Sequence, residues 1–267
     1  MICSILGGGQ ETKITLKVLK TKPKRAYCVR GATMTIDIHS HFLPKIDDGS
    51  HSVEESLAML KTAYGQGVTH MVATPHFYAD ECSVDRFLVR RERSLARLQE
   101  ETERETQIPK ILCGAEVYYF DGMGKAGLLS KLCIGDTQVL LLEMPFTQWT
   151  SRMADEVQAI LEKQKLQIIL AHIERYFELQ KDRSVWDYVM ELPLHVQMNG
   201  GVFLEWKRRR MANHLLKDYR PILLGSDCHN TTSRCPNLGG ARKYIEKKHG
   251  LAVLAQTDAL GRELLGL

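Results

Sequence analysis

Two histidines separated by one residue, His39 and His41, begin the part of the sequence that could do chemistry. They follow a short apolar run, residues 35–38, which predicts a strand. Residues i and i+2 of a strand project from the same side, so both imidazoles can reach one metal ion. Asp47 and Asp48 follow and offer hard oxygen ligands to the same cluster. An isolated pair of this kind is more often a polar turn, so the other histidines and acids must decide its meaning.

The elements that would position these residues alternate along the chain. Short apolar runs fall at 35–38, 68–73, 110–117, 139–143, 167–171, 195–198 and 222–225. Helical patterns lie between them; the first has Ser52 and Glu55 at the spacing of a capping box, and another covers residues 84–106. Near-continuous apolar strands that alternate with helices predict a parallel sheet in an α/β fold. Seven such units predict a closed or nearly closed barrel.

A polar or metal-ligating side chain follows every predicted strand. In chain order these residues are His39 and His41, His76, Glu116, Glu143, His172, Asn199, and Asp227 with His229. The carboxyl ends of barrel strands share one face, where catalytic residues gather. Each residue alone has a plainer explanation, such as a hydrogen-bonded structural histidine or a helix cap. Chance placement of all of them at matching positions is much harder to accept.

Composition limits the other function classes. The 267 residues contain no run of about 18 apolar residues, so no membrane insertion is expected. Seven cysteines without C-x-x-C spacing predict a reducing, cytoplasmic location. The net charge of +4 combines +6 in residues 1–33 with −2 in the remainder, so no nucleic-acid partner is expected. We expect residues 1–33 to form a flexible basic extension and 34–267 to form the barrel, with Met34 a candidate natural start.

With these residues in place, the chain resembles the polymerase and histidinol phosphatase (PHP) family. More narrowly, it is similar to the bacterial metal-dependent protein-tyrosine phosphatases encoded with capsule and exopolysaccharide genes. The matching segments are IDIHSH (36–41), DDG (47–49), ATPH (73–76), GAEVYY (114–119), LE (142–143), AHIERY (171–176) and GSDCHN (225–230). The resemblance covers residue 34 to the C-terminus. It implies a distorted seven-stranded (β/α)7 barrel of the TIM-like, PHP type.

The resemblance also implies three divalent metal ions. The first would be held by His39, His41, Glu116 and Asp227, the second by Glu116, Glu143 and His172, and the third by Asp48, His76 and His229. Imidazole and carboxylate ligands without thiolates suit manganese, iron or zinc. The tyrosine phosphatase branch is associated with manganese, so Mn²⁺ is the expected metal.

The expected chemistry is hydrolysis of a phosphate monoester by a metal-bridging hydroxide. Arg175 and Arg234 stand where the branch has arginines, and a guanidinium fork matches phosphate geometry. An ion pair with an acid beneath the site, such as Glu174, is the alternative role for both. The general acid is not identified.

A competing pattern lies in the last motif, since Cys228 and Arg234 satisfy the C-x5-R spacing of cysteine-dependent tyrosine phosphatases. That loop normally uses glycine to wrap backbone amides around phosphate and lowers the thiol pKa. Here residues 229–233 contain no glycine, and Asp227 would oppose a thiolate. We interpret the match as a coincidence.

Three functional hypotheses follow. The leading one is a phosphatase of phosphotyrosine on protein, with a cognate bacterial tyrosine kinase of polysaccharide biosynthesis as its partner. The second is a PHP phosphatase of a small metabolite such as histidinol phosphate, and the third is a non-catalytic barrel that binds metal or a partner. Trp149 could stack on a phosphotyrosyl ring or pack the barrel rim. The basic run Lys207 to Arg210 could guide an acidic phosphopeptide, although a solvated helix face is the more common role.

Overall fold

The computed structural model describes residues 34–267, so the extension predicted for residues 1–33 lies outside the described residues. The strands are β1 (Ile36–Ser40), β2 (His70–Ala73), β3 (His76–Phe77), β4 (Lys110–Cys113), β5 (Glu116–Tyr118), β6 (Val139–Glu143), β7 (Gln167–Leu170), β8 (His195–Asn199) and β9 (Leu223–Gly225). The α-helices are α1 (Val53–Gly65), α2 (Val84–Thr102), α3 (Ser151–Glu162), α4 (Ile173–Tyr176), α5 (Ser184–Glu191), α6 (Gly201–Leu204), α7 (Arg209–Asp218), α8 (Leu238–His249) and α9 (Leu251–Leu265). Two short 3₁₀ helices, Met123–Lys125 and Leu129–Leu132, connect β5 to β6.

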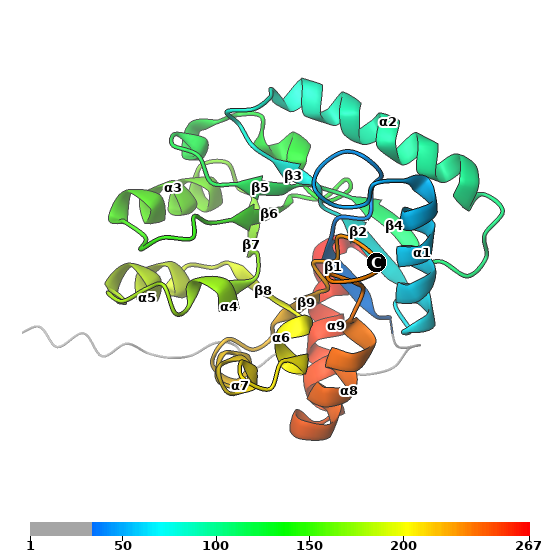
Figure 1. Ribbon diagram of the computed structural model, residues 1–267. Helices are drawn as coiled ribbons and strands as arrows, with labels where there is room; N and C mark the ends of the chain where they lie inside the picture. The colour runs from blue at the N-terminus through cyan, green and yellow to red at the C-terminus, as the bar shows by residue number, and fades with distance from the viewer. Residues whose placement is uncertain (1–33) are drawn as a thin grey trace, which may run out of the picture.

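All paired strands run parallel, in the orders β1-β2-β4 and β3-β5-β6-β7-β8-β9. The first and last strands approach each other through a bridge between Ser40 and Cys228. The amide of Asp227 donates to the His39 carbonyl at 2.8 Å, and the amide of His41 donates to the Cys228 carbonyl at 2.9 Å. The sheet therefore curls, and the helices lie around its outside (Figure 1). This arrangement confirms the predicted parallel α/β class.

The strand count differs from the predicted seven, because the run 110–117 is divided into two short strands and a further short strand, β3, follows the run 68–73. The run 68–73 ends as β2, and β3 begins after Thr74 and Pro75. Proline has no N–H to donate, and the Thr74 amide donates to the Ser40 carbonyl at 2.9 Å. Gly114 and Ala115 divide β4 from β5, and the Gly114 carbonyl accepts from Arg91 at 2.8 Å. Both breaks stand directly before a predicted metal ligand.

The core follows from the alternation of side chains along the strands. On β6, Leu140 and Leu142 pack outward with the helices, whereas Val139 and Leu141 belong to a second, inner cluster. Leu260 and Leu264 of α9 pack in that inner cluster. The inner cluster thus joins residues of β1, β2, β6, β7 and β9 with α9. The described helices include none that is long and apolar enough to span a membrane.

The predicted helix signals are largely correct. Ser52 caps α1 by accepting from the Glu55 amide at 3.2 Å, while the Glu55 carboxylate accepts from the His51 amide at 2.9 Å. In the usual capping box this carboxylate accepts from the amide of the N-cap residue; here it accepts from the residue before the N-cap. The helix predicted over 84–106 ends at Thr102, where α2 stops.

Candidate metal centre

The strands and the loops that follow them bring all of the predicted metal ligands together. Their ligand atoms form four overlapping groups, each with its atoms within 4.8 Å of one another: His41, Asp48, His76 and His229; His39, Glu116 and His172; His39, His41 and Asp227; and His76, Glu116 and Glu143. The grouping shows one continuous cluster. The division of these residues among three ions stays a prediction.

The H-x-H segment of β1 behaves as its strand geometry predicts. His39 Nε2 and His41 Nε2 lie 3.1 Å apart, and the Ser40 hydroxyl between them donates to the Val72 carbonyl at 2.6 Å. Both imidazoles face one carboxylate oxygen, Glu116 Oε2, at 3.2 and 3.3 Å. The two histidines and Glu116 thus define the centre of the cluster.

The second ring nitrogen of each histidine has a different partner. His41 Nδ1 donates to Asp47 Oδ2 at 2.8 Å, whereas His39 Nδ1 lies 3.2 Å from the amide oxygen of Gln197. An acceptor at Nδ1 fixes the tautomer that leaves Nε2 free to bind a metal. Asp47, which the sequence offered only as a possible oxygen ligand, is therefore a positioning residue for His41.

Asp47 also organises the loop that carries Asp48. Its carboxylate accepts from the amides of Gly49 at 3.0 Å and His76 at 3.1 Å. Only glycine fits at position 49, because a Cβ there would lie 2.1 Å from the His41 carbonyl oxygen. The Asp-Asp-Gly segment is thus a tight support for the first histidine pair as well as a source of ligands.

A chain of neutral amides on β8 supports the opposite side of the cluster. Gln197 Oε1 accepts from the His172 amide at 2.7 Å, and Gln197 Nε2 donates to Asn199 Oδ1 at 2.9 Å. Asn199 Nδ2 in turn donates to Asp227 Oδ2 at 2.8 Å. The sequence placed Asn199 at the strand end but missed Gln197. The two-residue alternation along β8 could have found it, since i and i+2 share a side.

Two predicted ligands have an unusual backbone conformation. His172 has φ 28° and Asp227 has φ 51°, a region that non-glycine residues seldom adopt. His172 Nε2 then lies 2.8 Å from Glu116 Oε1 and 3.3 Å from Glu143 Oε1. Such strain persists where surrounding contacts enforce it, and it is typical of functional sites.

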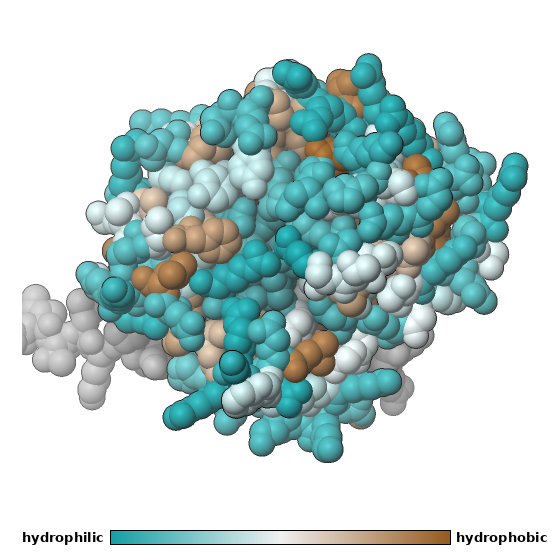
Figure 2. All heavy atoms as spheres, in the orientation of Figure 1, coloured by the Kyte–Doolittle hydropathy of each residue, from teal (hydrophilic) through white to brown (hydrophobic). Residues whose placement is uncertain are grey.

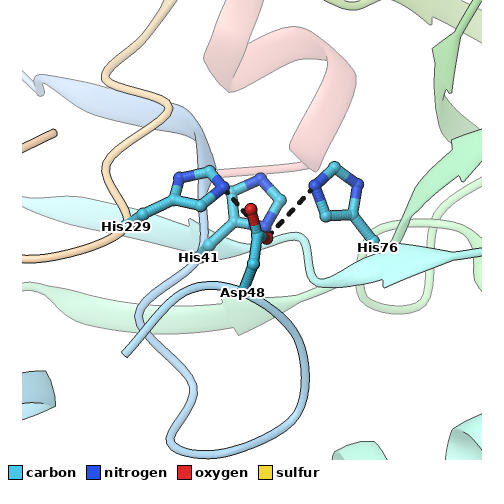
Figure 3. Close-up of side chains that lie close together, drawn as sticks. All are labelled: His41, Asp48, His76 and His229. Carbon is cyan, nitrogen blue, oxygen red and sulfur yellow. Dashed lines mark ion pairs between the residues drawn. The ribbon is translucent and has the colours of Figure 1, made fainter. Parts of the chain in front are cut away.

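The outer part of the cluster lies between two loops and β3. Asp48 projects from the loop after β1 toward the rings of His229 and His76, as Figure 3 shows. Asp48 Oδ1 lies 3.3 Å from His229 Nε2 and 3.5 Å from His76 Nε2. The His229 ring stacks on His41 with centroids 4.0 Å apart. The Asp48 side chain is 64% exposed, which distinguishes it from the other members of the cluster.

The charges of the cluster are strongly coupled to one another. Burial opposes a charge on His41, but the carboxylates of Asp47 and Glu116 outweigh it and raise the pKa of His41 to about 10. His172 is likewise buried, and Glu116 and Glu143 raise its pKa to about 9. Burial also opposes the charge on Glu116, yet the surrounding histidines hold its pKa well below the usual range. The carboxylates therefore stay ionised away from water, and a divalent cation would displace the compensating protons from the histidines.

The donor set fits divalent metal ions. His76 Nδ1 and His229 Nε2 are buried without a hydrogen-bond partner among residues 34–267. Yet they lie 3.0 Å from Glu116 Oε2 and 3.3 Å from Asp48 Oδ1, respectively. Buried polar atoms are normally satisfied, and a cation would give each nitrogen and its neighbouring carboxylate a common partner. Nitrogen and oxygen donors without thiolates suit manganese, iron or zinc.

Both predicted arginines reach the edge of the cluster. Arg175 Nη2 donates to Asp227 Oδ2, and Arg234 Nη2 donates to Asp227 Oδ1 at 2.9 Å. The ion pairs considered as the alternative role therefore form, but with Asp227 as the acid. The buried carboxylate of Glu174 instead faces the Asn199 amide at 3.3 Å. The side chains of Arg175 and Arg234 are 33% and 38% exposed, so each can meet a ligand from solvent.

The loop with the C-x5-R spacing does not form a phosphate cradle. The amides of His229 and Asn230 donate to the Arg234 carbonyl, and the amides of Thr232 and Arg234 donate to the Asn230 side chain. Cys228 is fully buried, and burial, together with Asp37, raises the pKa of its thiol well above the usual value. The geometry supports coincidence, as the sequence indicated.

The aromatic side chains decide between the two roles that the sequence allowed for Trp149, in favour of packing. Trp149 is buried and packs against Tyr176 and Trp186, so it belongs to the core and not to the mouth. Phe146 is 43% exposed instead, with its ring stacked on His172 at 5.7 Å between centroids. Tyr78 stacks on His76 at 5.3 Å. The sequence did not single out either residue, because each is one aromatic in a loop.

A parallel α/β barrel with a histidine–carboxylate cluster at its strand ends defines a protein with a candidate polynuclear metal centre. Residues 35–258 match the family described as capsular polysaccharide synthesis, CpsB/CapC, and the chain belongs to this family. This result confirms the resemblance to the capsule-associated branch. The match includes every residue of the cluster.

Individual relatives agree with the family match. The tyrosine-protein phosphatase CpsB of Streptococcus pneumoniae is 30% identical over 231 residues, covering 80% of this chain and 91% of that protein. The tyrosine-protein phosphatase YwqE of Bacillus subtilis is 27% identical over 222 residues, covering 80% and 85%. The fold is similar to that in the crystal structures of YwqE and CpsB, described as metal-dependent tyrosine phosphatases. The TM-score is 0.76 at 22% identity, over 87% of this chain and 94% of the other.

Proposed function

We propose that this protein is a metal-dependent protein-tyrosine phosphatase that acts in capsule or exopolysaccharide synthesis. The observation that carries the proposal is the convergence of histidine and carboxylate ligands from separate strand ends, with Arg175 and Arg234 at their edge. Family membership and the names of the relatives supply the reaction class and the phosphotyrosyl substrate.

The residues of the cluster would hold three divalent ions, with Mn²⁺ the expected metal. The first set is His39, His41, Glu116 and Asp227; the second is Glu116, Glu143 and His172; the third is Asp48, His76 and His229. When bound, the ions would supply an activated water and neutralise phosphoryl oxygens. Asp47 and Gln197 keep the Nε2 atoms of His41 and His39 directed at the cluster.

Arg175 and Arg234 would bind the phosphoryl group. Both guanidinium groups are partly exposed and converge on Asp227 from its two carboxylate oxygens. A planar fork of N–H donors matches two phosphoryl oxygens, which orients the ester at the cluster. A tyrosyl leaving group has a pKa near 10, so it needs less protonation than a serine alkoxide would.

The partner would be a phosphotyrosine-containing protein, such as a cognate bacterial tyrosine kinase. Figure 2 shows a predominantly hydrophilic face with scattered hydrophobic residues, which is compatible with a transient encounter. In the basic run after the 75% exposed Trp206, Arg209 donates to the carbonyls of Phe203 and Leu204. Lys207 and Arg210 are exposed and would be the members of that run able to meet an acidic peptide.

The test combines metal analysis with substrate comparison. Purified protein loaded with Mn²⁺ should hydrolyse a phosphotyrosyl peptide far faster than histidinol phosphate, and a chelator should remove the activity. Restoration by added Mn²⁺ is the control for irreversible damage. Full activity in chelator would exclude the metal mechanism, preference for histidinol phosphate would favour a metabolite phosphatase, and metal binding without turnover would favour a non-catalytic barrel.

A further inference from the structure

A cavity of about 360 Å³ lies directly beside the outer part of the cluster. Its lining includes Ile46, Asp48, His76, Tyr78, Cys82 and Arg90. We propose that this cavity holds the aromatic ring of the substrate's phosphotyrosyl group, and that Tyr78 is the specificity-determining residue against which the ring packs. The inference rests on the proposed function and adds a binding site for the leaving group to it.

The position of the cavity carries the first step. Asp48 and His76 belong both to the cavity lining and to the candidate outer metal group. Both arginines pair with Asp227, and Arg234 Nη1 also lies 3.8 Å from Asp48 Oδ2, so Arg234 reaches the edge of the cavity. A phosphoryl group held between the arginines and the metal ligands therefore has this cavity next to it. The ester substituent, which is attached directly to phosphorus through one oxygen, must occupy a neighbouring space.

The lining of the cavity suits a flat apolar ring. Tyr78 is held in place on His76, with centroids 5.3 Å apart and planes inclined by 27°, and on Tyr118 at 5.5 Å. Ile46 and Cys82 add apolar surface. Aromatic rings prefer offset-stacked or edge-to-face neighbours at such separations, so a fixed tyrosine favours an aryl group over an alkyl group.

Two charged residues, Arg90 and Glu81, also line the cavity. The Arg90 guanidinium donates to the Ile46 carbonyl at 2.6 Å and lines the cavity from α2. Glu81 also lines the cavity and is exposed. Apolar walls with a few polar groups are typical of small-ligand sites of about 300–1,000 Å³. The cavity thus fits a phenyl ring, while the peptide that carries the ring remains in solvent.

Phe146 is the competing aromatic and provides a matched control. Its exposed ring stacks on His172 and contacts Tyr176 at 5.4 Å, on the side of the cluster that carries Glu143. It does not belong to the cavity lining. The Phe146→Leu substitution therefore removes an aromatic ring near the cluster without changing the proposed ring site.

Calorimetric binding of phenylphosphonate and inorganic phosphate to the Mn²⁺-loaded, full-length protein tests the proposal without requiring turnover. Tyr78→Leu should weaken phenylphosphonate binding about tenfold, which corresponds to about 1.4 kcal/mol. Phosphate binding should stay within about twofold, since the metals and arginines are unchanged. Tyr78→Phe, which keeps the ring, and Phe146→Leu should both bind phenylphosphonate like the unmodified protein. Cys82→Phe, which fills the cavity, should repeat the selective loss.

Other outcomes would overturn the inference. Equal losses for both ligands in Tyr78→Leu would mean that Tyr78 supports the metal cluster and not the ring. A selective loss in Phe146→Leu alone would move the ring to the other side of the centre. A separate assay of phosphotyrosyl peptide hydrolysis distinguishes the two proposals: an inactive protein that still shows the selective binding pattern refutes the phosphatase function and keeps the aryl site. An active protein without that pattern supports the phosphatase function and refutes the aryl site.

Discussion

The inner and outer parts of the cluster are built in different ways. The inner side chains, His39, His41, Glu116, His172 and Asp227, lie on a strand or within two residues of its end and are at most 4% exposed. The outer member Asp48 comes from a loop, and its side chain is 64% exposed. His76 lies between the two parts, with one nitrogen toward Glu116 and the other toward Asp48.

The difference teaches that strand register fixes the inner ligands, while a side-chain network fixes the outer ones. The unusual φ values of His172 and Asp227 and the amides of Gln197 and Asn199 leave the inner part little freedom. The outer part depends on Asp47, which accepts from the amide of His76 and from that of Gly49. We therefore expect the inner metal positions to bind firmly and the outer position to exchange more readily with solvent.

Substitution of Asp227 should have the largest effect. Asp227→Ala removes the carboxylate that faces His39 and His41, and it leaves Arg175 and Arg234 without their common partner. We expect loss of phosphatase activity by at least about 1,000-fold, together with loss of bound metal. Steady-state kinetics and elemental metal analysis measure both effects, and circular dichroism checks the fold. Normal metal content with normal turnover would contradict the assignment of the inner part.

Substitution of Asp48 should have a smaller effect. Asp48→Ala removes the exposed outer carboxylate from His229 and His76 while the inner ligands stay in place. We expect the loss of one metal ion per chain, partial retention of activity, and an unfolding temperature of the metal-free protein close to that of the unmodified chain. If Asp48→Ala emptied every metal position, the distinction between a firm inner part and an exchangeable outer part would fail.

Asp47 and Gln197, which contact the Nδ1 atoms of His41 and His39, allow a finer comparison. Asp47→Asn keeps the shape of the acceptor for His41 Nδ1 but removes its charge. Loss of such a supporting partner typically costs about 10- to 100-fold in metal affinity or activity. The affinity for Mn²⁺, measured by titration against a competing chelator, should fall within that range. An unchanged affinity would show that a neutral amide serves His41 as well as Gln197 serves His39.

Gln197→Leu should mainly lower the free energy of unfolding, since it changes no charge at the cluster. It removes the acceptor of the His172 amide and the donor to Asn199, both buried. A buried polar group left without a partner costs about 1–3 kcal/mol. Denaturant unfolding of the metal-free protein should report that loss, and Asp47→Asn is the matched variant at the residue that contacts His41. A larger loss in Asp47→Asn would place the main support on the β1 side.

The sequence was most informative where backbone geometry decides the outcome. The spacing of His39 and His41 and the strand-end positions of Glu116 and Asp227 follow from strand periodicity, and the cluster forms as that periodicity predicts. The partner of Arg175 could not be predicted in this way. Neighbouring residues on a helix point in different directions, so Glu174 is directed toward Asn199 and leaves Arg175 to Asp227.

Side-chain networks between distant segments could not be predicted from the sequence either. Gln197 acts through contacts with His39 and His172, which lie 158 and 25 residues away in the chain. No spacing rule connects those positions before the barrel is closed. Trp149 shows the same limit, because its burial depends on Tyr176 and Trp186 from later elements.

Cys228 should show the smallest effect of all, although it is adjacent to Asp227. Its thiol is fully buried, and the amides after it bond within their own loop, so it has neither access to a substrate nor a phosphate cradle beside it. Cys228→Ala should leave turnover within about twofold, with a modest loss of stability from the small cavity it creates. In the same assay Asp227→Ala should abolish the activity. The reverse pattern, an inactive Cys228→Ala and an active Asp227→Ala, would replace the metal mechanism with a cysteine nucleophile.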